Sequence, residues 1–213
     1  MTPAAEGRPS GSPGLRERKK RETRAALSQA AIRLCVQHGW ARVTIDRIAA
    51  EADVSVRTFR NYFSGKAEAI AAGHVERMLR VADDLLARPA GEPLWDSLRH
   101  AVLGQFVPPD AFAPQNEGNE RWYEGVRLML AEPALAGEVA KANAAAQQDL
   151  AEAVARRTGT DTGGDVYPNL VAAVVAAGCA VAVEHSLRSD HPVPLGMALT
   201  QVFERLAAGL PVP

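Results

Sequence analysis

The segment from Val43 to Lys66, VTIDRIAAEADVSVRTFRNYFSGK, contains two short helical patterns joined by a tight turn. In the first pattern Thr44 can cap a helix with its hydroxyl, and apolar residues recur at three- and four-residue steps at Ile45, Ile48, Ala49 and Ala52. In the second pattern Ser55 can cap again, and one side is aromatic through Phe59, Tyr62 and Phe63. Asp53 lies at the turn, where aspartate can adopt a left-handed backbone at modest cost. The pattern predicts a helix-turn-helix unit, which places its second helix in the major groove of DNA.

The charge of the chain is divided unequally along its length. Residues 1–66 contain 13 Lys and Arg against 6 Asp and Glu, whereas residues 67–213 contain 11 against 19. A solvated charge run would explain the segment RERKKRETR if it stood alone. Next to a helix-turn-helix, however, the basic end indicates DNA binding, because Lys and Arg supply the sequence-independent affinity for phosphates.

Helical periodicity extends over most of the 213 residues, and no strand-like alternation of useful length is present. The sequence therefore predicts an all-α protein with a disordered arm at 1–14, a three-helix DNA-binding domain at 15–65 and a regulatory helical bundle at 66–213. Glycine and proline positions place the longer helices at residues 15–38, about 66–88, 94–106, 120–131, 133–157, 168–188 and 195–210.

The remaining composition argues against several other classes of protein. Cys35 and Cys179 lie far apart in apolar helical stretches, which favours buried thiols and a reducing compartment. The N-terminus lacks an apolar signal region, and the apolar run at 170–183 is too short to span a bilayer, so we expect a cytoplasmic protein without a membrane partner. No zinc-spaced His and Cys set, Gly-rich phosphate loop or nucleophile elbow is present, so we expect no metal, no cofactor and no enzyme activity.

Residues 21–70 resemble the TetR family of transcriptional regulators. The resemblance rests on matches at fixed offsets: Thr23, Arg24, Ala30, Ala31, Gly39, Trp40, Thr44, Ile48, Ala49, Val54, Ser55, Thr58, Phe59, Tyr62, Phe63 and Lys66. The sequence departs from the family at Asp53, where glycine is usual, at Arg60, where an aromatic residue is common, and at Cys35, where phenylalanine is common. The resemblance implies a regulator, by family default a repressor, that binds double-stranded DNA.

The DNA-contacting residues follow from this interpretation. Arg57 and Arg60 are expected to read bases, because arginine can donate two hydrogen bonds to guanine, and Asn61 can do the same with adenine; contact with phosphates alone is the alternative for the arginines. The resemblance implies phosphate contacts for Thr44, Tyr62 and Lys66. The complete predicted set is Thr44, Ser55, Val56, Arg57, Thr58, Arg60, Asn61, Tyr62 and Lys66.

The resemblance also implies a homodimer formed by the last two long helices of each chain. The apolar character of residues 170–183 supports this independently, although a core helix of a monomer is the alternative. The predicted interface residues are Val175, Cys179, Val183, Leu199, Val202, Phe203 and Leu206. A dimer suits a palindromic operator with half-sites about 34–36 Å apart or a multiple of that distance.

Members of the family enclose a small-molecule cavity in the C-terminal bundle, and the resemblance implies the same here, with a small lipophilic effector that releases the operator. Apolar, aromatic and a few polar side chains suit such a cavity, which indicates Trp95, Phe106, Trp122, Met129, Asn143, Gln147 and Cys179. Ordinary core packing is the alternative for each of them. A regulator that answers to a protein partner is a further alternative, and it predicts an exposed groove and no closed cavity.

Overall fold

The computed structural model describes residues 14–107, 117–188 and 193–212, with the backbone alone for 117–123. Over these ranges the chain forms nine α-helices and no strand, which confirms the all-α prediction. Only Gly14 of the arm predicted at 1–14 falls within the described residues. The helix that contains residues 170–183, α8 (Val166–Ser186), is long and apolar enough to cross a membrane by length and composition alone, contrary to the sequence prediction, and 44% of its most apolar stretch is buried in the fold.

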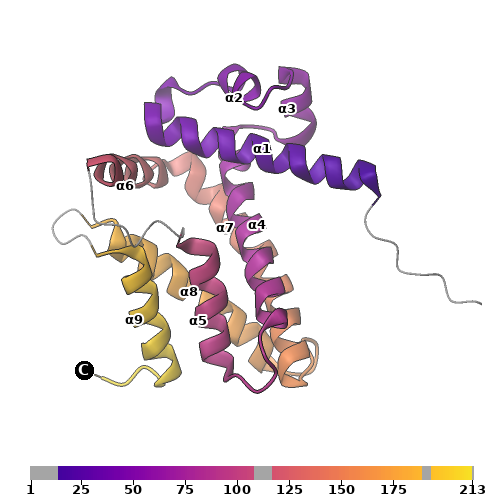
Figure 1. Cartoon of the computed structure of the whole chain (residues 1–213), viewed down its shortest axis with the longest axis vertical. Coiled ribbons are helices and arrows are strands. Elements are labelled where there is room, and N and C mark those ends of the chain that lie inside the picture. The colour runs from indigo at the N-terminus through magenta and orange to yellow at the C-terminus, as the bar shows by residue number, and fades with distance from the viewer. Residues whose placement is uncertain (1–13, 108–116, 189–192, 213) are drawn as a thin grey trace, which may run out of the picture.

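The helix ends agree closely with those indicated by the glycine and proline positions. In chain order the helices are α1 (Leu15–His38), α2 (Ile45–Glu51), α3 (Val56–Tyr62), α4 (Lys66–Ala87), α5 (Leu94–Phe106), α6 (Glu117–Leu130), α7 (Pro133–Thr158), α8 (Val166–Ser186) and α9 (Leu195–Ala207). A short 3-10 turn, Trp40–Arg42, connects α1 to α2. Figure 1 shows α1, α2 and α3 gathered at one end of the molecule and the remaining helices extending away from them.

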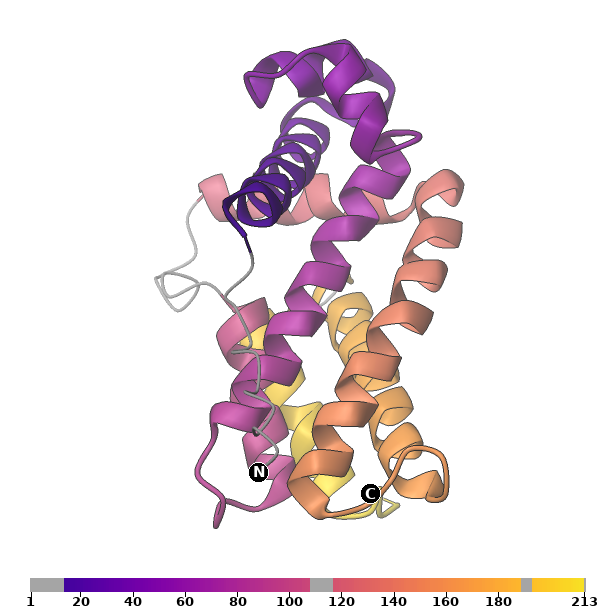
Figure 2. The same cartoon turned by 90° about the vertical axis from the view of Figure 1, so that its right-hand side faces the viewer.

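Helix α4 belongs to two hydrophobic cores. Its first part, Ala69–Ala72, is buried with α1, α2 and α3, whereas its second part, from Met78 to Leu85, is buried with α5, α7, α8 and α9. The predicted domain boundary at residue 66 is the start of α4, but the change from one core to the other occurs inside the helix, between Ala72 and Met78. In Figure 2, α4 runs from the helix-turn-helix end down the length of the bundle beside α7.

Glycines allow three helix pairs to approach closely. A Cβ on Gly73 would lie 2.7 Å from Ser28 Oγ of α1, and one on Gly178 would lie 2.9 Å from Val202 Cγ1 of α9. At Gly125 of α6 the added carbon would overlap the backbone carbonyl of Val36 in α1. Because a backbone carbonyl cannot turn aside as a side chain can, this last contact holds the regulatory bundle against the DNA-binding domain at a spacing that only glycine permits.

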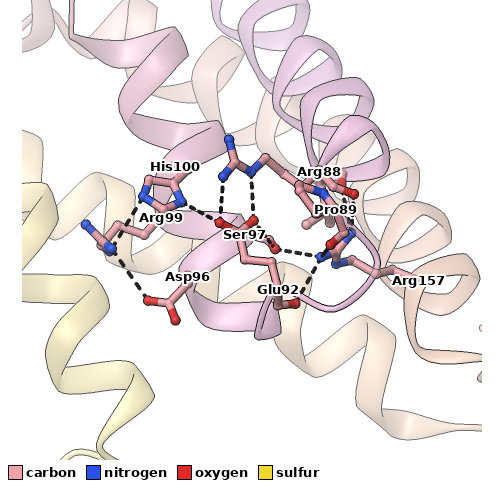
Figure 3. Close-up of polar contacts among 9 residues, drawn as sticks. Arg88, Pro89, Glu92, Asp96, Ser97, Arg99, His100 and Arg157 are labelled. Carbon is pink, nitrogen blue, oxygen red and sulfur yellow. Dashed lines mark hydrogen bonds and ion pairs between the residues drawn. The ribbon is translucent and has the colours of Figure 1, made fainter.

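Arg157 joins the end of α7 to the loop between α4 and α5 (Figure 3). Its guanidinium donates to the carbonyl oxygens of Leu85 at 3.2 Å, Arg88 at 3.1 Å, Pro89 at 2.7 Å and Glu92 at 3.0 Å, and to Ser97 Oγ at 2.7 Å. The carbonyls at the C-terminal end of a helix have no intrahelical partner, and here Arg157 supplies one. The planar fork of arginine suits this task, since it holds several donors in fixed directions.

Glu92 occupies the opposite side of the same network. Its carboxylate accepts from Arg88 Nε at 2.7 Å and from Ser97 Oγ at 2.7 Å, and it lies 3.0 Å from His100 Nδ1. The hydrogen bonds from Arg88, followed by those from Ser97 and His100, lower the pKa of Glu92 to about 2. A carboxyl whose pKa is depressed on folding stabilises the fold above its unfolded pKa, so this contribution is lost only as the pH falls toward 2.

We predict that Arg157→Ala lowers the free energy of unfolding by about 2–3 kcal/mol, because four backbone carbonyls at the end of α4 and in the following loop each lose a charged donor. Arg156→Ala is the matched control: Arg156 is the exposed neighbour, and it makes no hydrogen bond with described residues. Urea unfolding followed by circular dichroism measures both variants. Equal stability of the two variants would contradict a clamping role for Arg157.

Candidate functional site

The two short helices of the helix-turn-helix begin at the predicted capping residues. Thr44 Oγ1 accepts a hydrogen bond from Arg47 N at 3.3 Å, and Ser55 Oγ accepts one from Thr58 N at 3.0 Å. Between the helices, Asp53 has φ +52°, as the sequence predicts. Each capping hydroxyl accepts its hydrogen bond through an oxygen lone pair. The hydroxyl proton of Thr44 therefore remains free to be donated to a phosphate. The local sequence therefore fixes both helix starts and the turn without help from the bundle.

One face of α3 is polar, exposed and unpaired. Arg57, Arg60 and Asn61 are spaced i, i+3, i+4, so their side chains share a face. All three are exposed, and none makes a hydrogen bond or ion pair with another described residue. The opposite side is fixed in the core by Phe59 and Phe63, which are 0% and 2% exposed. Seven residues of helix are about 10 Å long, a size that fits the major groove.

The C-terminal end of α3 is held by a cation of α1. Arg24 of α1 lies over the Phe63 ring, with its Cζ 4.5 Å from the ring centroid, and it donates to the carbonyl of Tyr62 at 3.4 Å. The Tyr62 hydroxyl has no hydrogen-bond partner among the described residues, so it remains available to a phosphate. Of the other predicted contacts, Thr44 and Ser55 are exposed, whereas Val56 and Thr58 are half-buried.

Lys66 also stabilises the fold, through contacts that were not predicted from the sequence. Its ammonium donates to the carbonyls of Trp40 at 2.6 Å and Val43 at 3.0 Å, and lies 4.3 Å from the centroid of the Trp40 ring. These contacts fasten the 3-10 turn to the start of α4. Since lysine has three donors, one remains for a phosphate beside the two that are already used.

A second group of polar side chains lies inside the bundle, between α4, α5, α7 and α8. His74 of α4 is hydrogen-bonded to Asn143 Oδ1 of α7 and meets the Phe106 ring edge-on, with centroids 6.3 Å apart. Arg77, one turn further along α4, lies over the same Phe106 ring at 5.0 Å. Burial lowers the pKa of His74, which keeps this imidazole neutral near pH 7.

Comparison with known proteins shows which class of protein carries these two groups of residues. Residues 27–72 match the model of bacterial regulatory proteins of the tetR family, and residues 92–211 match the model of the MftR C-terminal domain. The chain belongs to the TetR family of transcriptional regulators. Its α2 and α3 are therefore the helix-turn-helix of a DNA-binding regulator.

Two relatives resemble this TetR-family chain over nearly its whole length. The HTH-type transcriptional regulator TcmR of Streptomyces glaucescens is 31% identical over 95% of this chain and 88% of its own. The mycofactocin biosynthesis transcriptional regulator MftR of Mycobacterium tuberculosis is 32% identical over 91% of this chain and 93% of its own. Both relatives include the C-terminal bundle as well as the helix-turn-helix.

Solved structures show the same fold at lower sequence identity. SmeT, the repressor of the Stenotrophomonas maltophilia multidrug efflux pump SmeDEF, superposes with a TM-score of 0.52 over 89% of this chain and 93% of its own, at 22% identity. The fatty acid degradation regulator FadR of Bacillus halodurans gives a TM-score of 0.53 over 90% and 97%, at 15% identity. These similarities establish the TetR-family fold of the whole chain.

The residues predicted to line an effector cavity do not all meet in this TetR-family fold. Phe106, Asn143 and Cys179 come together around His74 and Arg77, and Gln147 lies one turn beyond Asn143. Met129 is buried in the core of the DNA-binding domain, so it was wrongly assigned to the cavity. Trp95 packs on the bundle core near the start of α5, while the side chain of Trp122 lies outside the described residues. The sequence prediction did not include His74 and Arg77. The available signal was that these two polar residues lie three positions apart within the apolar stripe of α4.

The hollows in the described part of this TetR-family chain are open to solvent. The better formed of two has a volume of about 530 Å³ and lies between the end of α1 and α6, lined by Cys35, His38, Glu124 and Leu128 among others. A smaller hollow of about 260 Å³ lies at the end of α7 near Arg156 and Asp161. Neither coincides with the cluster around Arg77. The predicted effector cavity therefore corresponds to neither of these two hollows.

The predicted dimer interface needs correction. Val175, Cys179, Leu199 and Phe203 are at most 2% exposed within one chain, so they are not available to a partner. Val202 and Leu206 pack against Gly178 of the same chain, and Val183 is half-buried. The physical reason is the row of small residues in α8, which lets α9 approach and cover the seam that the sequence assigned to a second subunit.

We predict that Arg60→Ala weakens operator binding by about 1–3 kcal/mol and relaxes base preference at one position, because a base-reading side chain is removed. Lys66→Ala should weaken binding to all sequences alike, since it alters the anchoring of Trp40 and a phosphate contact. Competition binding to a randomised operator measures both variants, with Arg205→Ala on exposed α9 as the control. A uniform loss at every base position for Arg60→Ala would remove its reading role.

Proposed function

We propose that this protein is a cytoplasmic repressor that binds a palindromic operator as a homodimer and is released by a small lipophilic effector in the regulatory bundle. The observation that carries the proposal is the exposed face of α3, where Arg57, Arg60 and Asn61 point away from the core without protein partners. Side chains capable of bidentate contacts with guanine and adenine are held there on a rigid helix. We assign the chain no catalytic step.

The proposed base contacts are accompanied by groups suited to phosphates. The suitable groups belong to the same small domain. They are the hydroxyls of Thr44, Ser55, Thr58 and Tyr62 and the remaining donor of Lys66. Val56 completes the surface with an apolar contact of the kind that thymine methyl groups favour. The basic excess of residues 1–66 supplies the long-range attraction to the duplex.

The surface of α8 supports a revised dimer interface. Leu170, Val174, Ala177 and Val181 follow one another at steps of four, three and four residues, so they form a single apolar stripe. Leu170 is 54% and Val181 57% exposed in the single chain, and Met197 of α9 is 54% exposed. An exposed apolar stripe on long helices is typical of a face that pairs with its symmetry mate. We propose this stripe as the subunit contact.

We predict that Val181→Asp converts the dimer to monomers at micromolar concentration, because two carboxylates would meet in an apolar contact near the symmetry axis. Val212→Asp is the matched control, because Val212 lies outside the proposed stripe and is 93% exposed. Multi-angle light scattering reports the mass of each variant. A wild-type chain that is monomeric under these conditions would contradict the proposed assembly.

The open groove between α1 and α6 favours a second candidate function, in which a protein partner sets the activity of the regulator. Such a partner would reach the contact between the DNA-binding domain and the bundle from outside, at His38, Glu124 and Leu128. The cluster of His74, Arg77, Phe106 and Asn143 favours the small-molecule mechanism, because a polar group inside a bundle suits a ligand better than a folded partner. Release of the operator by a purified small molecule would favour the small-molecule mechanism over the protein partner.

The proposed function is tested by selecting bound fragments from genomic DNA with the purified full-length chain. We expect salt-sensitive retention of promoter fragments that share an inverted repeat, with affinity falling steeply between low and moderate salt. A reporter placed behind a selected fragment should be silenced when the protein is expressed. Retention of no fragment, or activation of the reporter, would contradict DNA-binding repression.

A further inference from the structure

Arg77 lies in the bundle cluster with His74, Phe106 and Asn143, and its guanidinium makes no hydrogen bond with another described residue. It is partly buried on the inward side of α4, with the Phe106 ring 5.0 Å away as its described cation–π partner. No described carboxylate oxygen lies within 4.0 Å of its guanidinium. Its donors are not fully enclosed either, since the buried polar atoms without partners in the described part of the chain belong to Ser28 and Ser186. The guanidinium of Arg77 therefore keeps some contact with solvent.

The acidic groups nearby are occupied by other partners. Glu76 pairs with Arg80 at 3.3 Å, and Asp84 accepts a hydrogen bond from Gln105 at 2.7 Å. Cys179 of α8 is close enough to Arg77 to interact with its charge, but burial raises the pKa of the Cys179 thiol to about 12, so it stays protonated. An arginine remains charged even in such surroundings. A positive charge withdrawn from water without an anion is unfavourable, and an anionic ligand would relieve this.

The neighbours of Arg77 add donors and apolar surface. Asn143 turns its oxygen toward His74, which leaves its amide N–H groups as donors. Leu103 and Phe106 of α5 and the following Val107 are partly buried against the bundle core, and they provide a hydrophobic border beside the charge. The site thus combines hydrogen-bond donors, a fixed positive charge and apolar walls from four helices.

We propose that Arg77 and Asn143 bind the anionic head group of an amphipathic effector whose apolar body lies along α5 beside Phe106. This inference rests on the proposed function, because it identifies the chemical class of the molecule that releases the operator. Carboxylate and phosphate head groups share the required chemistry, since both accept two parallel hydrogen bonds from a guanidinium. Neutral and cationic lipophilic molecules lack that interaction and should bind more weakly.

The test compares two fluorescent probes of nearly the same shape, 1-anilinonaphthalene-8-sulfonate and the neutral N-phenyl-1-naphthylamine, on the full-length protein. We expect the wild type to bind the sulfonate more tightly, and Arg77→Gln to weaken its binding by about tenfold or more while the neutral probe is unaffected. Arg80→Gln is the matched control on the same helix, because Arg80 is exposed and already paired with Glu76. Displacement of the sulfonate by octanoate or by octyl phosphate separates the two kinds of head group.

Two outcomes would overturn the inference: equal affinity of the wild type for the two probes, or equal loss of both probes in Arg77→Gln with the helical signal and melting temperature unchanged. If Arg77→Gln fails to fold, Arg77→Lys preserves the charge without the fork, and an undiminished preference for the sulfonate over the neutral probe in that variant would contradict bidentate binding. Operator binding is measured separately by gel retardation. Failure to retain DNA refutes the proposed function and leaves the probe result standing, whereas DNA retention with Arg77-independent probe binding refutes only the anion site.

Discussion

The structure depends on the burial of α4 in two cores at once. Ala69–Ala72 complete the core beneath the helix-turn-helix, and Met78, Val81 and Leu85 lie in the centre of the bundle. Burying a side chain of the size of valine or leucine stabilises a fold by about 1.5–3 kcal/mol, so each half of α4 is bound firmly to its own domain. The helix cannot change its position in one core without a response in the other. The polar residues His74 and Arg77 lie at the transition between the two.

The DNA-binding end shows how a small domain can hold an exposed polar helix in place. Two caps and one left-handed residue set the path of α2 and α3, while Phe59 and Phe63 anchor α3 from below. Lys66 then fastens the preceding turn through two backbone carbonyls and the face of Trp40. The exposed face of α3 contributes little to these stabilising contacts. Arg57, Arg60 and Asn61 can therefore be substituted without loss of the fold.

Much of this architecture could be predicted from the sequence, because it is specified locally. The caps at Thr44 and Ser55, the turn at Asp53 and the end of α1 at Gly39 all depend on residues within a few positions of one another. The dimer residues could not be predicted in the same way. Helix α8 is apolar nearly all round, so its sequence does not indicate which side faces α9 and which faces solvent. Its burial pattern shows that Val175 and Cys179 face inward, and Leu170 and Val181 outward.

The candidate effector site was only partly visible in the sequence for a related reason. Phe106, Asn143 and Cys179 were recognised by residue type, whereas Arg77 resembled one of several surface arginines of an amphipathic helix. Its importance comes from what surrounds it in space, which is a ring, a neutral thiol and acids already bound elsewhere. The polar pair His74 and Arg77 in the apolar stripe of α4 is visible in the sequence, but the contacts around it come from α5, α7 and α8, which lie far away along the chain.

The clamp made by Arg157 has a geometric consequence for the far end of α4. It holds the last turn of the helix to α7, whereas the first turn at Lys66 lies beneath the helix-turn-helix. The 22 residues of α4 make a lever about 33 Å long, so a tilt of one degree about the clamped end displaces the opposite end by about 0.6 Å. The clamped end of α4 is thus the end farthest from the DNA. The displacement is greatest at the other end, beneath the helix-turn-helix.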